Sequence, residues 1–276
     1  MTAGRGRASP GGGRCPVETP LPLVDAHAHL ADDSFAADLP EVLARARAAG
    51  VRRIVCVAET PADSRRVLEL AKRHPLLAPA IGLYPSHLDE EQLEEMTALI
   101  RGRRDELIAI GEIGLDRWIV KDEGGRARQL AFFLRQVELA RELDLPVNVH
   151  SRSAGRRTVA ALREAGARRV LLHAFDGRAG AALEGARAGF FFSIPPSIVR
   201  SRQKQKLVAA LPLESLLLET DSPVLGPDPG SRNEPANVTV ALEEIARIKR
   251  ISEEEVARAT TRNALRLFGE RLLPPG

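Results

Sequence analysis

Eight short apolar segments alternate with segments of helical spacing, and this alternation constrains the fold more than any other feature. The apolar segments read as buried strands: 23–30, 51–58, 77–84, 107–115, 146–151, 169–175, 189–195 and 215–221. Helical spacing is found at 38–49, 61–74, 89–101, 126–143, 156–165, 179–187, 201–210, 236–250 and 252–267. Alternating strands and helices are typical of a parallel sheet that is covered by helices.

The number of strands selects the architecture within this class. Eight such units over about 250 residues predict an α/β fold, a single (β/α)8 TIM barrel. The alternative is an open doubly wound sheet, which commonly carries a glycine-rich turn after its first strand. Here the first strand ends without glycine. We expect a disordered tail at 1–22, the barrel at 23–270 and a short tail at 271–276.

Composition excludes several other classes of protein. Hydrophobic residues make up 44% and charged residues 28%, which is ordinary for a globular chain. There is no apolar run long enough for a transmembrane helix, and two cysteines cannot form a disulfide scaffold. We therefore expect no membrane partner and an intracellular location, cytoplasmic, nuclear or both. The net charge is only +3, so binding to phosphate would require a local cluster of cations.

Histidines and carboxylates gather at the ends of five predicted strands. His27 and His29 alternate along the first strand and share a face. The other strands end at Glu112, His150, His173 and Asp221. In a β/α barrel that end is the mouth of the active site. Four of the chain's six histidines lie at this rim, and imidazole is a common ligand of transition metals.

The number of ligands predicts two divalent ions, with one ion as the alternative. A catalytic zinc takes three protein ligands and keeps one position open, so six ligands suit two ions. Glu112 is the natural bridging carboxylate, and Asp221 could act as general base toward a metal-activated water. Zinc is the expected metal, and manganese or magnesium could replace it. Because the sequence contains neither a nucleophile-elbow motif nor a nucleotide-binding motif, we expect hydrolysis without a nucleotide cofactor.

Basic residues near the same rim indicate an anionic substrate. Arg152 follows the fifth strand and Arg232 follows the eighth, and both are predicted to contact phosphate. Ser222 and Asn233 lie in the same loop as Arg232 and are further candidates. Other basic residues near these strands are expected to lie mainly on solvated helix surfaces: Arg156, Arg157, Arg200, Arg202, Lys204 and Lys206.

These motifs resemble the TatD family of metal-dependent deoxyribonucleases, within the amidohydrolase-like barrels. The match runs from about 23 to 268, and two stretches are most similar to the branch of TatD-domain-containing protein 3. The motifs are Asp25-Ala-His27-Ala-His29, Gly111-Glu112-Ile-Gly-Leu-Asp116, Pro146-Val-Asn-Val-His150-Ser-Arg152, Leu172-His173-Ala-Phe175, Glu219-Thr-Asp221-Ser222-Pro223, Arg232-Asn233-Glu-Pro235 and Asn263-Ala-Leu-Arg-Leu-Phe268.

The resemblance implies a division of the ligands and a substrate. His27, His29 and Asp221 would hold one ion with Glu112, and His150 and His173 would hold the second with the same carboxylate. The implied activity is that of a DNA 3′ exonuclease that acts on 3′ ends or single strands, with abasic-site processing as a further possibility. One position departs from the family, because Tyr84 stands where members carry a histidine near the substrate phosphate. A phenol can still donate a hydrogen bond to phosphate.

Two other functions are compatible with the same residues. A small-molecule amidohydrolase or lactonase would use the same metal ligands, although the basic rim favours phosphate. A structural role for the metal is the third reading, and the apparent base Asp221 argues against it.

Overall fold

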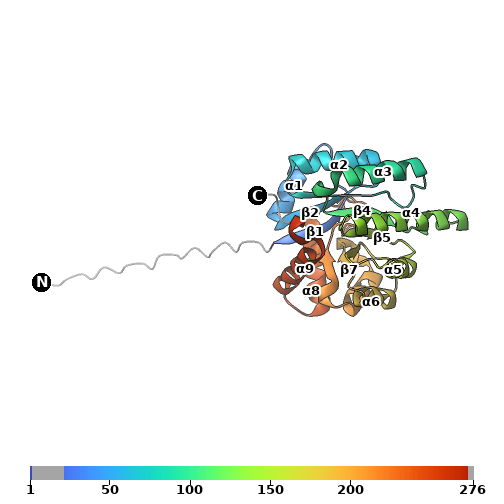
Figure 1. The fold of residues 1–276 in the computed structure, drawn as a ribbon. Helices are drawn as coiled ribbons and strands as arrows, with labels where there is room; N and C mark the ends of the chain where they lie inside the picture. The colour runs from blue at the N-terminus through green and yellow to red at the C-terminus, as the bar shows by residue number, and fades with distance from the viewer. Residues whose placement is uncertain (2–21, 273–276) are drawn as a thin grey trace.

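The structure, a computed structural model, describes residue 1 and residues 22–272 as a barrel of eight parallel strands surrounded by helices (Figure 1). The strands are β1 (Leu23–Ala28), β2 (Val51–Val57), β3 (Leu77–Ile81), β4 (Ala109–Gly114), β5 (Val147–His150), β6 (Val170–Leu172), β7 (Phe191–Ile194) and β8 (Leu216–Leu218). Each lies inside one of the eight predicted segments. The predicted strand–helix alternation is therefore confirmed.

The helices follow the predicted segments closely. They are α1 (Leu39–Ala48), α2 (Pro61–Arg73), α3 (Glu90–Arg103), α4 (Glu123–Glu142), α5 (Gly155–Glu164), α6 (Ala179–Arg187), α7 (Arg202–Ala210), α8 (Val238–Lys249) and α9 (Glu253–Phe268). Two of these helices, α3 and α9, begin with a side-chain cap, because Asp89 accepts from the backbone N–H of Gln92 and Ser252 accepts from that of Glu255. Such caps satisfy N–H groups that have no partner within the helix.

The strands are arranged in the order of the sequence, and each pairs in parallel with the next. The segments that follow β1 and β8 bring the two edges together. The N–H of Asp221 donates to the carbonyl of His27 at 2.9 Å, and the N–H of His29 donates to the carbonyl of Ser222 at 2.7 Å. The result is a nearly closed barrel, as predicted, whose seam lies beside the predicted site residues.

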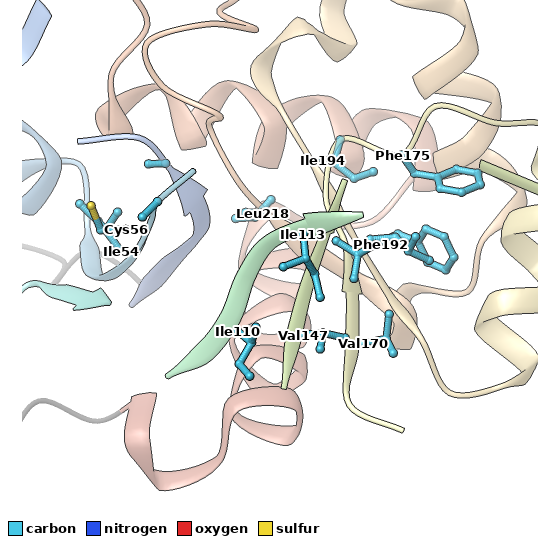
Figure 2. Close-up of a cluster of buried hydrophobic side chains, with 14 of the residues drawn as sticks. Ile54, Cys56, Ile110, Ile113, Val147, Val170, Phe175, Phe192, Ile194 and Leu218 are labelled. Atoms are coloured by element: carbon cyan, nitrogen blue, oxygen red, sulfur yellow. The ribbon is translucent and has the colours of Figure 1, made fainter. Parts of the chain in front are cut away.

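Alternate residues of the strands face two different apolar clusters. Ile54 and Cys56 belong to the larger cluster, which lies between the strands and the outer helices (Figure 2). Val55 and Val57 belong to the smaller one, together with Phe268 of α9. Because neighbouring side chains of a strand point to opposite sides, the smaller cluster fills the interior of the barrel. Helix α9 contacts both β1 and β8, so it supports the seam.

Removing the Phe268 ring should destabilise the barrel strongly. Phe268 is 1% exposed, and its replacement by alanine would leave a cavity inside the small cluster. We expect Phe268→Ala to lower the free energy of unfolding by about 3–5 kcal/mol, measured by urea denaturation. Leu265→Ala on the same helix is the control, because Leu265 is 39% exposed. Equal effects of the two substitutions would contradict this packing.

The first and last described residues can be compared with the predicted domain limits at 23 and 270. The predicted tail at 1–22 lies almost entirely outside the described residues, as do residues 273–276. A final helical turn spans Gly269–Leu272, and Leu272 is buried in the small cluster. The described structure thus continues two residues beyond the domain end predicted at 270. Within the described part of the chain, none of the helices is both long and apolar enough to cross a membrane.

Candidate metal centre

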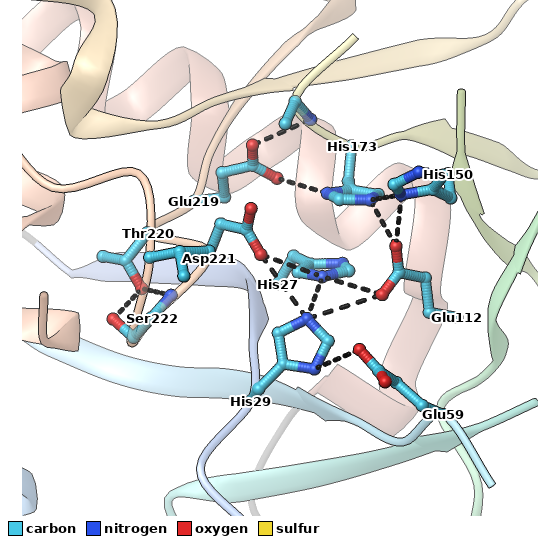
Figure 3. A network of polar contacts seen from close by, with 12 residues as sticks. His27, His29, Glu59, Glu112, His150, His173, Glu219, Thr220, Asp221 and Ser222 are labelled. Carbon is cyan, nitrogen blue, oxygen red and sulfur yellow. Dashed lines mark hydrogen bonds and ion pairs between the residues drawn. The ribbon is translucent and has the colours of Figure 1, made fainter. Parts of the chain in front are cut away.

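The seam between β1 and β8 assembles the first group of predicted ligands (Figure 3). The Nε2 atoms of His27 and His29 are 3.1 Å apart. The Oδ1 atom of Asp221 lies 3.5 Å from the first and 3.4 Å from the second. An oxygen of Glu112, from β4, lies 3.7 and 3.4 Å from the same two nitrogens. Four side chains from three strands or strand ends therefore converge on one point.

The second group is built around the other oxygen of Glu112. Oε1 of Glu112 lies 2.7 Å from Nδ1 of His150 and 2.7 Å from Nε2 of His173. These two nitrogens are 3.2 Å apart. His150 ends β5 and His173 follows β6, so neighbouring strands supply this pair. Glu112 directs one oxygen toward each group, which is the arrangement that a bridging carboxylate requires.

The residues fit divalent ions by the spacing and chemistry of their donor atoms. Zinc–nitrogen bonds of about 2.0–2.1 Å place two tetrahedral ligand nitrogens about 3.3 Å apart. The nitrogens of His27 and His29, and those of His150 and His173, have nearly this separation. Two triads of donor atoms share Glu112, one with His27 and His29 and one with His150 and His173. The donor set suits zinc, manganese or a similar ion.

The electrostatics of the metal-free cluster favour ionised carboxylates. Burial raises the pKa of Glu112, but the charge of His173 and the hydrogen bonds to His150 and His173 outweigh it, and the pKa falls well below its usual value. Burial lowers the pKa of His27 to about 3. His29 differs, because the hydrogen bond to Asp221 and the charge of Glu112 overcome burial and raise its pKa to about 9. Contacts with Asp116 and Glu112 likewise overcome burial and raise the pKa of His150 to about 9.

Metal binding should therefore release protons near neutral pH. With pKa values of about 9, His29 and His150 are protonated at pH 7 in the metal-free protein. A metal ligand must be the neutral imidazole, so loading at pH 7 should release close to one proton from each. Calorimetry in two buffers of different ionisation enthalpy measures this release, and the part that comes from the two histidines should disappear above about pH 10. Release that is independent of pH would contradict the role of these histidines as ligands.

Several polar residues around the ligands hold them in place. Nδ1 of His27 lies 2.9 Å from Oδ1 of Asn148, whose amide also donates to the carbonyl of Ala26. Thr220 donates from its N–H and its hydroxyl to Asp25, which fixes the backbone just before Asp221. Groups that orient metal ligands in this way tune the affinity of a site.

Three acidic residues near the ligands were not among the predicted site residues: Glu59, Asp116 and Glu219, whose Oε2 lies 3.9 Å from Nδ1 of His173. Oδ2 of Asp116 lies 3.1 Å from Nε2 of His150, and Oε1 of Glu59 lies 3.8 Å from Nδ1 of His29. Glu59 comes two residues after the end of β2. That position at the barrel mouth was the signal that could have identified it.

A pocket of about 460 Å³ opens over the ligand groups. Its lining includes His29, Glu112, His150, His173 and Asp221, together with Glu59, Tyr84, Arg152, Asp176 and Lys204. The hydroxyl of Tyr84 lies 3.4 Å from Nε2 of His150. Lys204 is 9% exposed and donates to the carbonyl of Ala174 at 3.1 Å. Arg152 and Tyr84 thus line the pocket, and their contact with phosphate stays a prediction; Lys204 also lines it, although its sequence context favoured a solvated helix.

The other predicted phosphate contacts have protein partners in the structure. Arg232 pairs with Asp38 through two bonds of 2.8 and 2.6 Å and is not among the residues lining the pocket. The amide of Asn233 donates to the carbonyls of Thr220 and Val224. The hydroxyl of Ser222 donates to that of Thr220 at 2.7 Å. That Arg232, Asn233 and Ser222 contact phosphate stays a prediction. Each would have to give up its present hydrogen bonds within the protein to do so.

Comparisons with known proteins agree with the geometry. The family model of the TatD related DNases matches residues 24–269. Human deoxyribonuclease TATDN3 is 49% identical over 89% of this chain and 94% of its own length. The uncharacterized metal-dependent hydrolase YabD of Bacillus subtilis is 37% identical over 89% of this chain and 98% of its own length.

A solved structure supports the same assignment. YJJV, a TatD homolog from Escherichia coli, superposes with a TM-score of 0.83 at 31% identity, covering 89% of this chain and 97% of its own. The ligand groups at the barrel mouth, the matched family model and the relatives all lead to one conclusion. This chain belongs to the TatD related DNase family and is a metal-dependent hydrolase.

Proposed function

We propose that this protein is a DNA 3′ exonuclease that hydrolyses the terminal phosphodiester of a single strand with two divalent ions. The observation that carries the proposal is the sharing of Glu112 by two groups of ligands, beneath a pocket with basic side chains. Two such ions, when bound, stabilise the charge of the transferred phosphate and acidify a water molecule. Zinc is the ion that we propose for both positions, and abasic-site processing is a second reaction of the same kind.

The protein's own residues would bind the phosphate and move the proton. Arg152 provides a planar guanidinium that matches phosphate oxygens, and Lys204 adds an amine to the same pocket lining. The Tyr84 hydroxyl can donate to a further oxygen. Asp221 is the proposed general base, because its side chain is 9% exposed and its carboxylate faces the same point as His27 and His29. Although burial raises its pKa, the hydrogen bond to His29 and the neighbouring histidines lower it, so the group is ionised and can accept a proton.

The size of the pocket favours a chain end over a long duplex. Its volume of about 460 Å³ is within the range of sites for small molecules, and the chain as a whole carries little net charge. A long basic groove would be needed to follow a duplex backbone. We therefore expect weak, salt-sensitive binding of short single-stranded ends.

The experiment compares linear and circular single-stranded DNA of the same sequence, with zinc, manganese or magnesium. An exonuclease shortens the linear strand and leaves the circle intact. Cleavage of the circle would overturn the exonuclease assignment, although the protein would still be a DNA hydrolase. A linear strand with one internal abasic position tests the second proposed reaction, abasic-site processing. Hydrolysis of neutral lactones or amides without DNA cleavage would favour the small-molecule alternative.

A further inference from the structure

The loop that follows β4 carries an exposed tryptophan beside the pocket. Trp118 is 60% exposed, an unusual state for a large aromatic side chain in the described part of the chain. The guanidinium carbon of Arg152, a residue of the pocket lining, lies 5.1 Å from the centre of the indole ring. The amine of Lys121 lies 5.9 Å from the same centre. An open aromatic surface and two cations therefore adjoin the proposed phosphate site.

One carboxylate ties this loop to the metal ligands. Oδ1 of Asp116 accepts from the backbone N–H groups of Trp118 and Ile119, at 2.8 and 3.0 Å. Oδ2 of the same residue lies 3.1 Å from His150. The N–H of Arg117 donates to the carbonyl of Arg152 at 3.0 Å, which joins the loops after β4 and β5. The backbone of Trp118 is thus held at a fixed distance from the ligands, although its indole ring is largely exposed.

We propose that Trp118 is a stacking platform for a nucleobase of the single-stranded substrate, with Arg152 holding the adjoining phosphate. This inference rests on the proposed function and names the part of the substrate that the pocket does not enclose. Aromatic rings stack on any base, so the platform gives affinity for single strands without preference for sequence. Duplex DNA, whose bases are already stacked and paired, would have to be unpaired at its end to use it.

The chain contains a single tryptophan, so its fluorescence reports on this site alone. The probe is a six-nucleotide oligothymidylate, added to the protein in EDTA so that cleavage does not occur. We expect quenching of the emission of Trp118 on excitation at 295 nm, and much weaker quenching by an oligonucleotide of the same length that lacks all its bases. Equal quenching by the two oligonucleotides, or none by either, would overturn the proposal.

Kinetics distinguish this inference from the proposed function. In the metal-loaded protein, Trp118→Ala should lower kcat/KM for single-stranded DNA about 5- to 150-fold, the range for loss of one stacked base. The loss for methyl p-nitrophenyl phosphate, a diester without a base, should be at least fivefold smaller. Trp118→Phe keeps an aromatic face and should recover part of the activity, and Ile119→Ala, a change in the exposed neighbour, is the matched control. If the unaltered protein cleaves neither substrate, the proposed exonuclease function is contradicted. If it cleaves DNA and the Trp118→Ala variant cleaves DNA equally well, only the proposal that Trp118 stacks on a base is contradicted.

The salt dependence separates stacking from an indirect effect on Arg152. Loss of a phosphate contact flattens the dependence of binding on salt, by about 0.7 in the logarithmic slope for a single strand. Trp118→Ala should weaken binding and leave this slope unchanged, whereas Arg152→Gln should flatten it. A flattened slope in Trp118→Ala would show that the indole only positions Arg152, and would contradict stacking.

Discussion

Replacing Glu112 with glutamine is expected to lower the rate of DNA hydrolysis about a thousandfold. Glu112 contacts both groups of ligands, with one oxygen toward His27 and His29 and the other toward His150 and His173. A thousandfold loss corresponds to roughly 4 kcal/mol, within the contribution of metal ions to stabilising transition-state charge. Elemental analysis of the purified variant should show fewer than two ions per chain.

The control for this change is Glu106→Gln, which removes an exposed carboxylate that pairs with Arg103 shortly before β4. It should keep both the rate and the metal content of the unaltered protein. Circular dichroism establishes that both variants are folded. A Glu112→Gln variant that retained two tightly bound ions and full activity would show that the carboxylate is not shared between them.

Asp221→Asn should lower kcat by about 10²- to 10⁴-fold, the contribution of a positioned general base. The amide has nearly the same shape but cannot accept the proton of a water molecule. Because the two Glu112-centred triads remain, the loss of bound metal should be smaller than in Glu112→Gln. The measurement combines single-turnover rates at saturating DNA with metal content determined on the same sample.

Asp228→Asn serves as the control, since it changes an exposed carboxylate of the loop that also carries Asp221. Its rate should stay within twofold of the unaltered protein. An Asp221→Asn variant with full activity and an unchanged metal content would remove Asp221 from the mechanism. If the unaltered protein itself had no hydrolytic activity although it bound two ions, the metal would be structural.

Much of the fold was predictable because each buried strand is a short run of apolar residues that can be recognised in the sequence. Parallel strands that are covered on both faces must be apolar throughout, so all eight were visible as short runs without an alignment. The convergence of the candidate metal ligands was predictable for a related reason. In a β/α barrel the ends of different strands meet at one mouth, so His150 and His173 could be placed together although they are far apart in the sequence.

The other residues that line the pocket were harder to predict, because loops obey no such periodicity. Arg232 follows β8, but the loop turns the side chain toward Asp38 and away from the pocket. Lys204 lies on α7 with other cations, and only the packing of that helix shows that its amine enters the pocket lining. Glu59 was missed because it lies alone at a strand end, outside any quoted motif. These outcomes depend on tertiary contacts that the sequence pattern does not encode.

The most direct test of a two-ion site centred on Glu112 is the digestion of single-stranded DNA that carries a label at its 5′ end. The reaction is run with metal-loaded protein, with the same protein after EDTA treatment, and with Glu112→Gln. Our account predicts progressive shortening from the 3′ end by the loaded protein, none after EDTA treatment, and shortening about a thousandfold slower in Glu112→Gln. Shortening that persisted after complete metal removal, or that was equally fast in Glu112→Gln, would contradict it.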